Sequence, residues 1–160
     1  MKSKAAIGNH PIHPALVTIP IGAFVLALIG DIATTATGLQ FWYSFALYCI
    51  LIGILGALLA AVFGFVDYLA VAMSAVAKRL ATIHMALNLS AVVLYVVSLL
   101  LRMNNAAFQT SRWVPAMALE IIALVTLGTS GWLGGQMAYV HRVGVLESED
   151  ETQRAARRAA

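Results

Sequence analysis

Charged residues are scarce in this sequence. Only 11% of its 160 residues are Asp, Glu, Lys or Arg, whereas 61% are hydrophobic, and the mean hydropathy is +0.88. Soluble globular domains carry about 25% charged residues, so this composition excludes an ordinary soluble enzyme. It predicts a protein whose surface faces lipid.

Cysteine and the common catalytic motifs are also lacking. The single cysteine, Cys49, cannot form an intrachain disulfide. Because it lies within an apolar run, we interpret it as a small core residue rather than a metal ligand. The sequence contains no phosphate-binding loop, no serine-nucleophile motif and no nucleic-acid-binding signature. No reaction class follows from it, and whether the protein is an enzyme stays open.

Long hydrophobic runs are what the sequence has instead. They cover residues 14–36, 42–66, 82–101 and 114–140. Each reaches the roughly 20 residues needed to cross a bilayer core of about 30 Å. Short polar breaks separate them at residues 38–40, 75–80 and 102–112. The predicted fold is therefore an all-α integral membrane protein, a bundle of four transmembrane helices with short loops.

The ends of the chain fit the same fold. The first run is long and lacks a clear cleavage site, so we interpret it as a helix rather than a signal peptide. Residues 1–146 form the predicted transmembrane domain, and residues 147–160, ESEDETQRAARRAA, form a charged cytoplasmic tail.

Basic residues are distributed unequally between the two sides of such a bundle. Eight lie on the side of the termini and the middle loop: Lys2, Lys4, Lys78, Arg79, Arg142, Arg154, Arg157 and Arg158. Only Arg102 and Arg112 lie on the other side. The positive-inside rule then predicts that both termini are cytoplasmic.

This topology brings all four histidines to the inner end of the bundle. His10 and His13 precede the first helix, Asp67 ends the second, His84 begins the third within about one turn, and His141 ends the fourth. Ionisable groups at membrane depth are usually paired and functional, and imidazole is the commonest protein ligand for transition metals and haem iron. We therefore predict one shared polar site at the inner face, although each histidine alone could be a simple interfacial residue.

The motif HPIHP adds a local geometry. Proline disfavours the helical conformation in the residue before it, so His10 and His13 are predicted to lie in a stiff, non-helical segment over the inner mouth. Pro14 suits the first turn of the helix, and Pro20 is expected to kink it.

Two further features have alternative interpretations. The second and fourth helices are rich in glycine, with Gly131 and Gly135 in GxxxG spacing; such faces serve close helix packing or leave a slot for a flat ring such as haem. At the outer end, Asp31 and Glu120 are expected to form structural ion pairs with Arg102 and Arg112 rather than a proton route.

Several motifs together resemble a known family. HPIHPALVTIPIGAF, GFVDYL, HMALNLSAVVLYVVSLLLR and GWLGGQMAYVHRVGV occur in this order over about residues 9–146. They are similar to a family of small bacterial inner-membrane proteins of unknown function, with an HPxHP start and a GxLGGxxxYxHxVGV end. The family's recurring polar positions fall here on His10, His13, Asp31, Asp67, His84, Asn88 and His141.

The resemblance implies a multi-pass protein of the bacterial inner membrane. Some relatives look like fusions to a Rieske iron–sulfur domain, which implies a membrane redox or energy-transducing complex as a partner and possible contact with quinone. The present chain cannot supply a Rieske ligand set itself, because it has one cysteine.

Three functional hypotheses follow. The first is a b-type haem protein for electron transfer, with His84 and His141 as axial ligands, His10 or His13 as a third or alternative ligand, and Arg142 or Arg79 near a propionate. The second is a non-haem metal site formed by His10, His13, His84 and His141 with Asp67. The third is a non-catalytic accessory subunit of a larger membrane complex.

Overall fold

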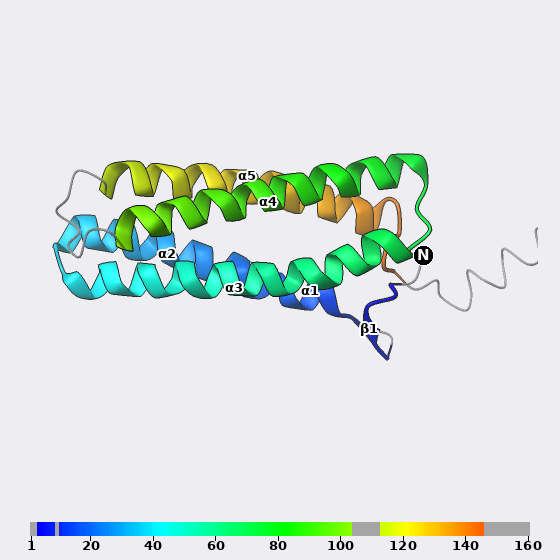
Figure 1. Ribbon diagram of the computed structural model, residues 1–160, viewed down its shortest axis with the longest axis horizontal. Helices are drawn as coiled ribbons and strands as arrows, with labels where there is room; N and C mark the ends of the chain where they lie inside the picture. The colour runs from blue at the N-terminus through cyan, green and yellow to red at the C-terminus, as the bar shows by residue number, and fades with distance from the viewer. Residues whose placement is uncertain (1–2, 9, 104–112, 146–160) are drawn as a thin grey trace, which may run out of the picture.

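The computed structural model describes residues 3–8, 10–103 and 113–145. Four long antiparallel helices run side by side (Figure 1): α2 (Thr18–Thr37), α3 (Gln40–Ala70), α4 (Ala75–Met103) and α5 (Trp113–Tyr139). A short helix, α1 (Ile12–Leu16), precedes α2 and belongs to the same apolar span. All four spans are long and apolar enough to cross a membrane, which confirms the predicted bundle.

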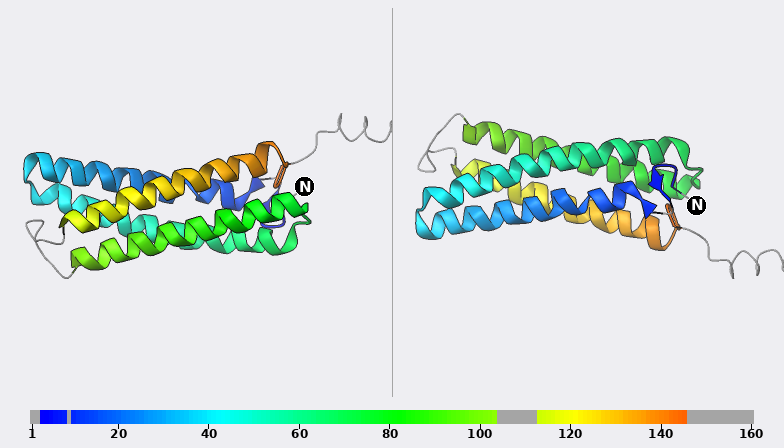
Figure 2. Two further views of the ribbon diagram at one scale, coloured as in Figure 1. Left: turned by 90° about the horizontal axis from the view of Figure 1, so that it is seen from above. Right: turned by 90° about the horizontal axis from the view of Figure 1, so that it is seen from below.

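The bundle consists of two helical hairpins. Helix α2 packs along α3, and α4 packs along α5, while contacts between the two hairpins are fewer; Figure 2 shows this arrangement from two opposite sides. Gly38 closes the first hairpin in a left-handed conformation, with φ of 68°, and donates its N–H to the carbonyl of Thr34. Glycine adopts this conformation without steric cost.

The core joins the hairpins near the middle of the bundle. The ring of Phe24 in α2 stacks on that of Tyr95 in α4, with centroids 3.7 Å apart. A Cβ at Gly53 in α3 would lie only 2.4 Å from the Phe24 ring, so this glycine makes room for the stack. Many leucine, isoleucine and valine side chains point outward, as expected for a surface in contact with lipid.

The second predicted polar break was placed wrongly. Residues 75–80, AVAKRL, form the first turns of α4, and the connection is only residues 71–74. Alanine, leucine, lysine and arginine are all strong helix formers, and a long basic side chain at a helix end can leave the apolar layer. The ammonium group of Lys78 donates to the carbonyl of Tyr68, near the end of α3, and lies 3.5 Å from the centroid of that ring.

The segment before the bundle is partly as predicted. His10 is extended, in strand β2 (His10–Pro11), which pairs antiparallel with β1 (Ala6–Ile7). His13 is not extended, because α1 already begins at Ile12. Pro14 falls in the first turn of α1, where its missing N–H breaks no helical hydrogen bond, so the helix can start before the proline.

The first span is interrupted three residues before Pro20, whereas the predicted kink itself stays a prediction. The two helices α1 and α2 are separated at Val17. Pro20 has no N–H to donate to the carbonyl of Leu16, and its ring crowds that carbonyl.

Candidate functional site

Polar side chains gather at two levels of the bundle. We call the end that holds His13, His84 and the chain's N-terminal segment the histidine end, and the end that holds Arg102 the arginine end (Figure 1). The apolar stack of Phe24 and Tyr95 lies between them along the helices.

His13 lies against helix α3. Its Nδ1 is 2.8 Å from the carbonyl oxygen of Ala60. Gly64, one turn further along α3, leaves the space for the ring, because a Cβ there would lie 2.9 Å from two of its atoms. A carbonyl oxygen only accepts hydrogen bonds, so Nδ1 carries the proton and Nε2 keeps its lone pair in the neutral ring.

His84 is held in the same way in the other hairpin. Its Nδ1 lies 2.8 Å from the carbonyl oxygen of Ser130 in α5 and 2.9 Å from the Ser130 hydroxyl. The Asn88 amide nitrogen lies 2.9 Å from the opposite ring nitrogen, Nε2, one turn along α4. Gly134 faces this ring, since a Cβ there would lie 3.3 Å from it.

The two imidazoles meet across the seam between the hairpins. Their ring centroids are 6.4 Å apart and their planes nearly perpendicular, at 84°. Each ring has Nδ1 bound to a backbone carbonyl on its own hairpin. This hydrogen bond fixes the tautomer and the ring orientation, as it does in histidines that bind metals through Nε2.

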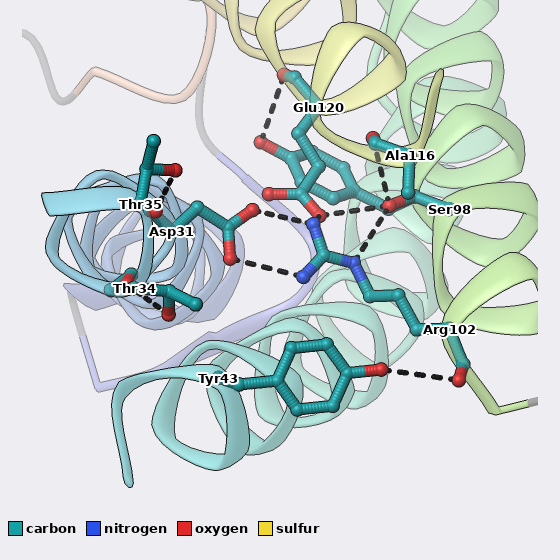
Figure 3. Close-up of polar contacts among 10 residues, drawn as sticks. Asp31, Thr34, Thr35, Tyr43, Ser98, Arg102, Ala116 and Glu120 are labelled. Atoms are coloured by element: carbon teal, nitrogen blue, oxygen red, sulfur yellow. Dashed lines mark hydrogen bonds and ion pairs between the residues drawn. The ribbon is translucent and has the colours of Figure 1, made fainter. Parts of the chain in front are cut away.

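The arginine end contains a buried ion cluster, drawn in Figure 3. Arg102 donates from Nη1 to Oδ1 of Asp31 at 3.0 Å and from Nη2 to Oδ2 at 2.5 Å. The same Nη2 donates to Oε1 of Glu120 at 2.5 Å. The predicted pairing of Asp31 and Glu120 with Arg102 is confirmed, whereas Arg112 lies outside the described residues.

Polar and aromatic neighbours complete the cluster. The Ser98 hydroxyl donates to Oε1 of Glu120 at 2.8 Å, and the Tyr43 hydroxyl donates to the carbonyl of Arg102 at 3.1 Å. The Trp113 ring covers the guanidinium, with its centroid 4.7 Å from Cζ. Tyr43 and Trp113 therefore close the ion cluster.

Residues 9–147 match the family described as predicted membrane protein (DUF2231). The chain belongs to the DUF2231 family. Comparison with curated proteins and with solved structures gave no match.

Membership in DUF2231 confirms the predicted membrane family and carries no assigned activity. The Rieske-fused relatives, the quinone and the bacterial inner membrane stay predictions. So do haem b and a transition metal as cofactors.

Asp67 of this DUF2231 chain binds the N-terminal segment. Its Oδ2 accepts from the Ser3 hydroxyl at 2.6 Å, and its Oδ1 accepts from the backbone N–H groups of Lys4 and Ala5 at 2.7 and 3.0 Å. It lies two turns beyond Ala60 on α3, about 10 Å closer to the helix end than the carbonyl that holds His13.

The residues of the predicted inner-face site therefore lie at different depths along the bundle. His84 lies nine residues into α4 rather than at its start, because α4 begins at Ala75. His141 follows the end of α5, and His10 lies in the strand before α1. No group of three or more His, Cys, Asp or Glu that could hold a metal ion is found within residues 3–8, 10–103 and 113–145. The structure brings together His13 and His84.

The sequence analysis did not predict the hydrogen-bond partners of His13, His84 and Arg102 other than the two carboxylates. Ser98 and Arg102, and likewise His84 and Asn88, are four residues apart, a spacing that puts both on one helix face. That signal was available. The carbonyls of Ala60 and Ser130 carry no sequence signal at all, since every residue has one.

The structure also shows which groups lie next to the glycines. The two imidazoles occupy the space beside Gly64 and Gly134. The rings of Phe24 and Phe45 occupy the space beside Gly53 and Gly30. Gly128 and Gly131 have no atom within 4 Å of a Cβ in the described part of the chain. At the first four glycines the facing groups are thus side chains of the protein itself. The GxxxG pair, Gly131 and Gly135, packs against no other helix among the described residues, so close packing of that face stays a prediction.

Proposed function

We propose that this chain is a membrane redox subunit in which His13 and His84 bind a metal centre at the histidine end. One observation carries the proposal: two imidazoles, one from each hairpin, meet with ring centroids 6.4 Å apart, each with Nδ1 on a backbone carbonyl. Nε2 is then the nitrogen that keeps the lone pair in both rings, and in His84 it faces the Asn88 amide.

The separation of the rings suits one shared ion. With metal–nitrogen distances of about 2.0–2.1 Å, two imidazoles that bind a single ion through Nε2 have ring centroids at most roughly 6.5 Å apart. The observed 6.4 Å lies within that limit, and a shared ion requires that both Nε2 atoms face it. Asn88, whose amide lies at Nε2 of His84, would turn away when an ion binds.

The packing favours a bare ion over haem b. The glycine faces at Gly64 and Gly134 are covered by the imidazoles, so a porphyrin between the rings would require the hairpins to separate. Imidazole nitrogen suits iron, copper or zinc, and a redox function selects iron or copper. Further ligands would come from water, or from His10, His141 or Asp67 if the N-terminal segment moves. Electrons would pass to a partner subunit or a quinone.

Purification from cells grown with ample iron, copper and haem tests the proposal. The protein is extracted in mild detergent, and its metal content and visible absorption are measured. We expect about one equivalent of iron or copper, reduced at least about tenfold in His13→Ala and His84→Ala. Tyr139→Phe, at an exposed position of the same end, is the matched control. His10→Ala and His141→Ala show whether those rings supply further ligands.

The outcomes separate the three hypotheses. A Soret band that disappears in His13→Ala and His84→Ala would identify the haem form. Less than about a tenth of an equivalent of any transition metal, with no Soret band, would contradict the proposal and leave the accessory subunit as the explanation.

A further inference from the structure

Among the residues that the structure describes, the ion cluster at the arginine end contains more negative than positive charge. Asp31, Glu120 and Arg102 expose 0%, 1% and 3% of their surface, so all three are buried. Two carboxylates and one guanidinium sum to a net charge of −1 if every group is ionised. An uncompensated charge at membrane depth is costly.

One atom of this cluster has no donor. Oε2 of Glu120 is buried and receives no hydrogen bond from any described residue. The carboxyls of Glu120 and Asp31 both bind the same nitrogen of Arg102, so they lie beside each other in the cluster (Figure 3). Two ionised carboxylates are acceptors only, so this contact becomes a hydrogen bond when one of them carries a proton.

The neighbouring groups in the described part of the chain cannot supply that proton. The Tyr43 hydroxyl donates to the carbonyl of Arg102, and the Tyr95 hydroxyl donates to the carbonyl of Glu120 at 3.5 Å. The Ser98 hydroxyl is directed at the carbonyl of Ala116 and at Oε1, the other oxygen of Glu120. Trp113 covers the guanidinium with its ring face. The missing proton must therefore come from outside the cluster.

We propose that Asp31 and Glu120 form a proton-binding site within the membrane. One proton from solvent binds Oε2 of Glu120 and is donated to an oxygen of Asp31, and the cluster changes from a net charge of −1 to neutral. No covalent bond other than this O–H forms, and no electron is transferred. Because Asp31, Arg102 and Glu120 come from α2, α4 and α5, the proton stabilises the contact between the two hairpins.

Infrared spectroscopy of the protein in lipid vesicles tests the site directly. At neutral pH we expect the carbonyl band of a protonated carboxylic acid in the unmodified protein. The band should disappear in Glu120→Gln and in Asp31→Asn, because either change leaves one carboxylate for one arginine. Asp67→Asn removes a carboxylate at the other end and should leave the band unchanged.

Unfolding as a function of pH gives a second, independent readout. The folded protein would bind one proton that an unfolded carboxyl releases at neutral pH, so stability falls as the pH rises, by up to about tenfold in the unfolding equilibrium per pH unit. Glu120→Gln keeps an N–H donor toward Asp31 and should remove this dependence. If Glu120→Gln does not fold, Asp31→Asn provides the same test of the pH dependence.

Two results would overturn the proposal. One is the absence of the protonated-acid band from the unmodified protein at neutral pH. The other is a band, or a loss of stability at alkaline pH, that persists unchanged in both Glu120→Gln and Asp31→Asn. Neither result depends on a metal at the histidine end, so this inference and the proposed function fail separately.

Discussion

At the scale of single residues, the histidine end depends on two glycines, which leave space for the imidazole rings. His13 and His84 reach their carbonyl partners because Gly64 and Gly134 have no Cβ. The two contacts differ in tightness: an added methyl group would lie 2.9 Å from the His13 ring but 3.3 Å from the His84 ring. The first is shorter than real contacts allow, so His13 must move, whereas the second requires a small shift.

We therefore predict a graded series of alanine substitutions. Gly64→Ala should destabilise the protein by about 1–3 kcal/mol through overpacking and weaken metal binding by displacing His13. Gly134→Ala should have a smaller effect. Gly131→Ala, where the Cβ position is open, should stay within about 0.5 kcal/mol. Denaturant unfolding in detergent measures all three, and equal effects at Gly64 and Gly131 would refute the packing argument.

At the scale of elements, the short N-terminal hairpin is attached to the bundle through one carboxylate. Asp67, in the last turn of α3, accepts three hydrogen bonds from Ser3, Lys4 and Ala5. The N–H of Ile12, the first residue of α1, donates to the carbonyl of Ala5 at 2.9 Å. Asp67 therefore positions the segment that leads to His13, and this role replaces direct metal ligation in the described conformation.

Asp67→Ala should release the N-terminal segment. Hydrogen bonds to a charged group contribute about 1.5–3 kcal/mol each, so the backbone amides of Lys4 and Ala5 should exchange with solvent at least about tenfold faster. Hydrogen exchange followed by mass spectrometry of the N-terminal peptide measures this. Arg79→Ala, an exposed charge at the same end, is the control. Unchanged exchange in Asp67→Ala would contradict the assigned role.

At the scale of the whole molecule, two hairpins are joined by polar contacts at both ends and an apolar stack between them. The histidine pair and the ion cluster each draw groups from both hairpins. Phe24 and Tyr95 separate these two levels. A metal at one end and a proton at the other would each strengthen the contact between the hairpins.

The orientation of this molecule in the membrane is a prediction of its charge distribution. In a Cys49→Ala background, Leu39→Cys places a thiol in the α2–α3 connection, and Ser74→Cys places one in the α3–α4 connection; both positions are exposed. A membrane-impermeant maleimide added to intact spheroplasts should label Leu39→Cys. It should label Ser74→Cys only after the spheroplasts are lysed. The opposite pattern would show that the histidine end faces outward.

The sequence by itself determined the number of spans, their approximate limits and the grouping of polar residues at two ends. Hydrophobic length and the alternation of helix direction are local properties, and they suffice to place His10, His13, Asp67, His84 and His141 at one end. They also put Asp31 and Glu120 beside Arg102. The boundary at Ala75 was missed because basic residues at a helix end resemble a loop in a hydropathy profile.

Only the tertiary structure decided which of these residues meet. A helix rises about 1.5 Å per residue, so the turn that a side chain occupies, and the rotation of its helix, select its neighbours. His13 and His84 share one depth because Ala60 and Ser130 offer carbonyls there. Asp67 lies nearer the end of its helix and binds the chain's start instead. Every residue has a backbone carbonyl, and every glycine leaves space beside it. Only the packing of the helices decides which side chain binds the carbonyl or occupies the space.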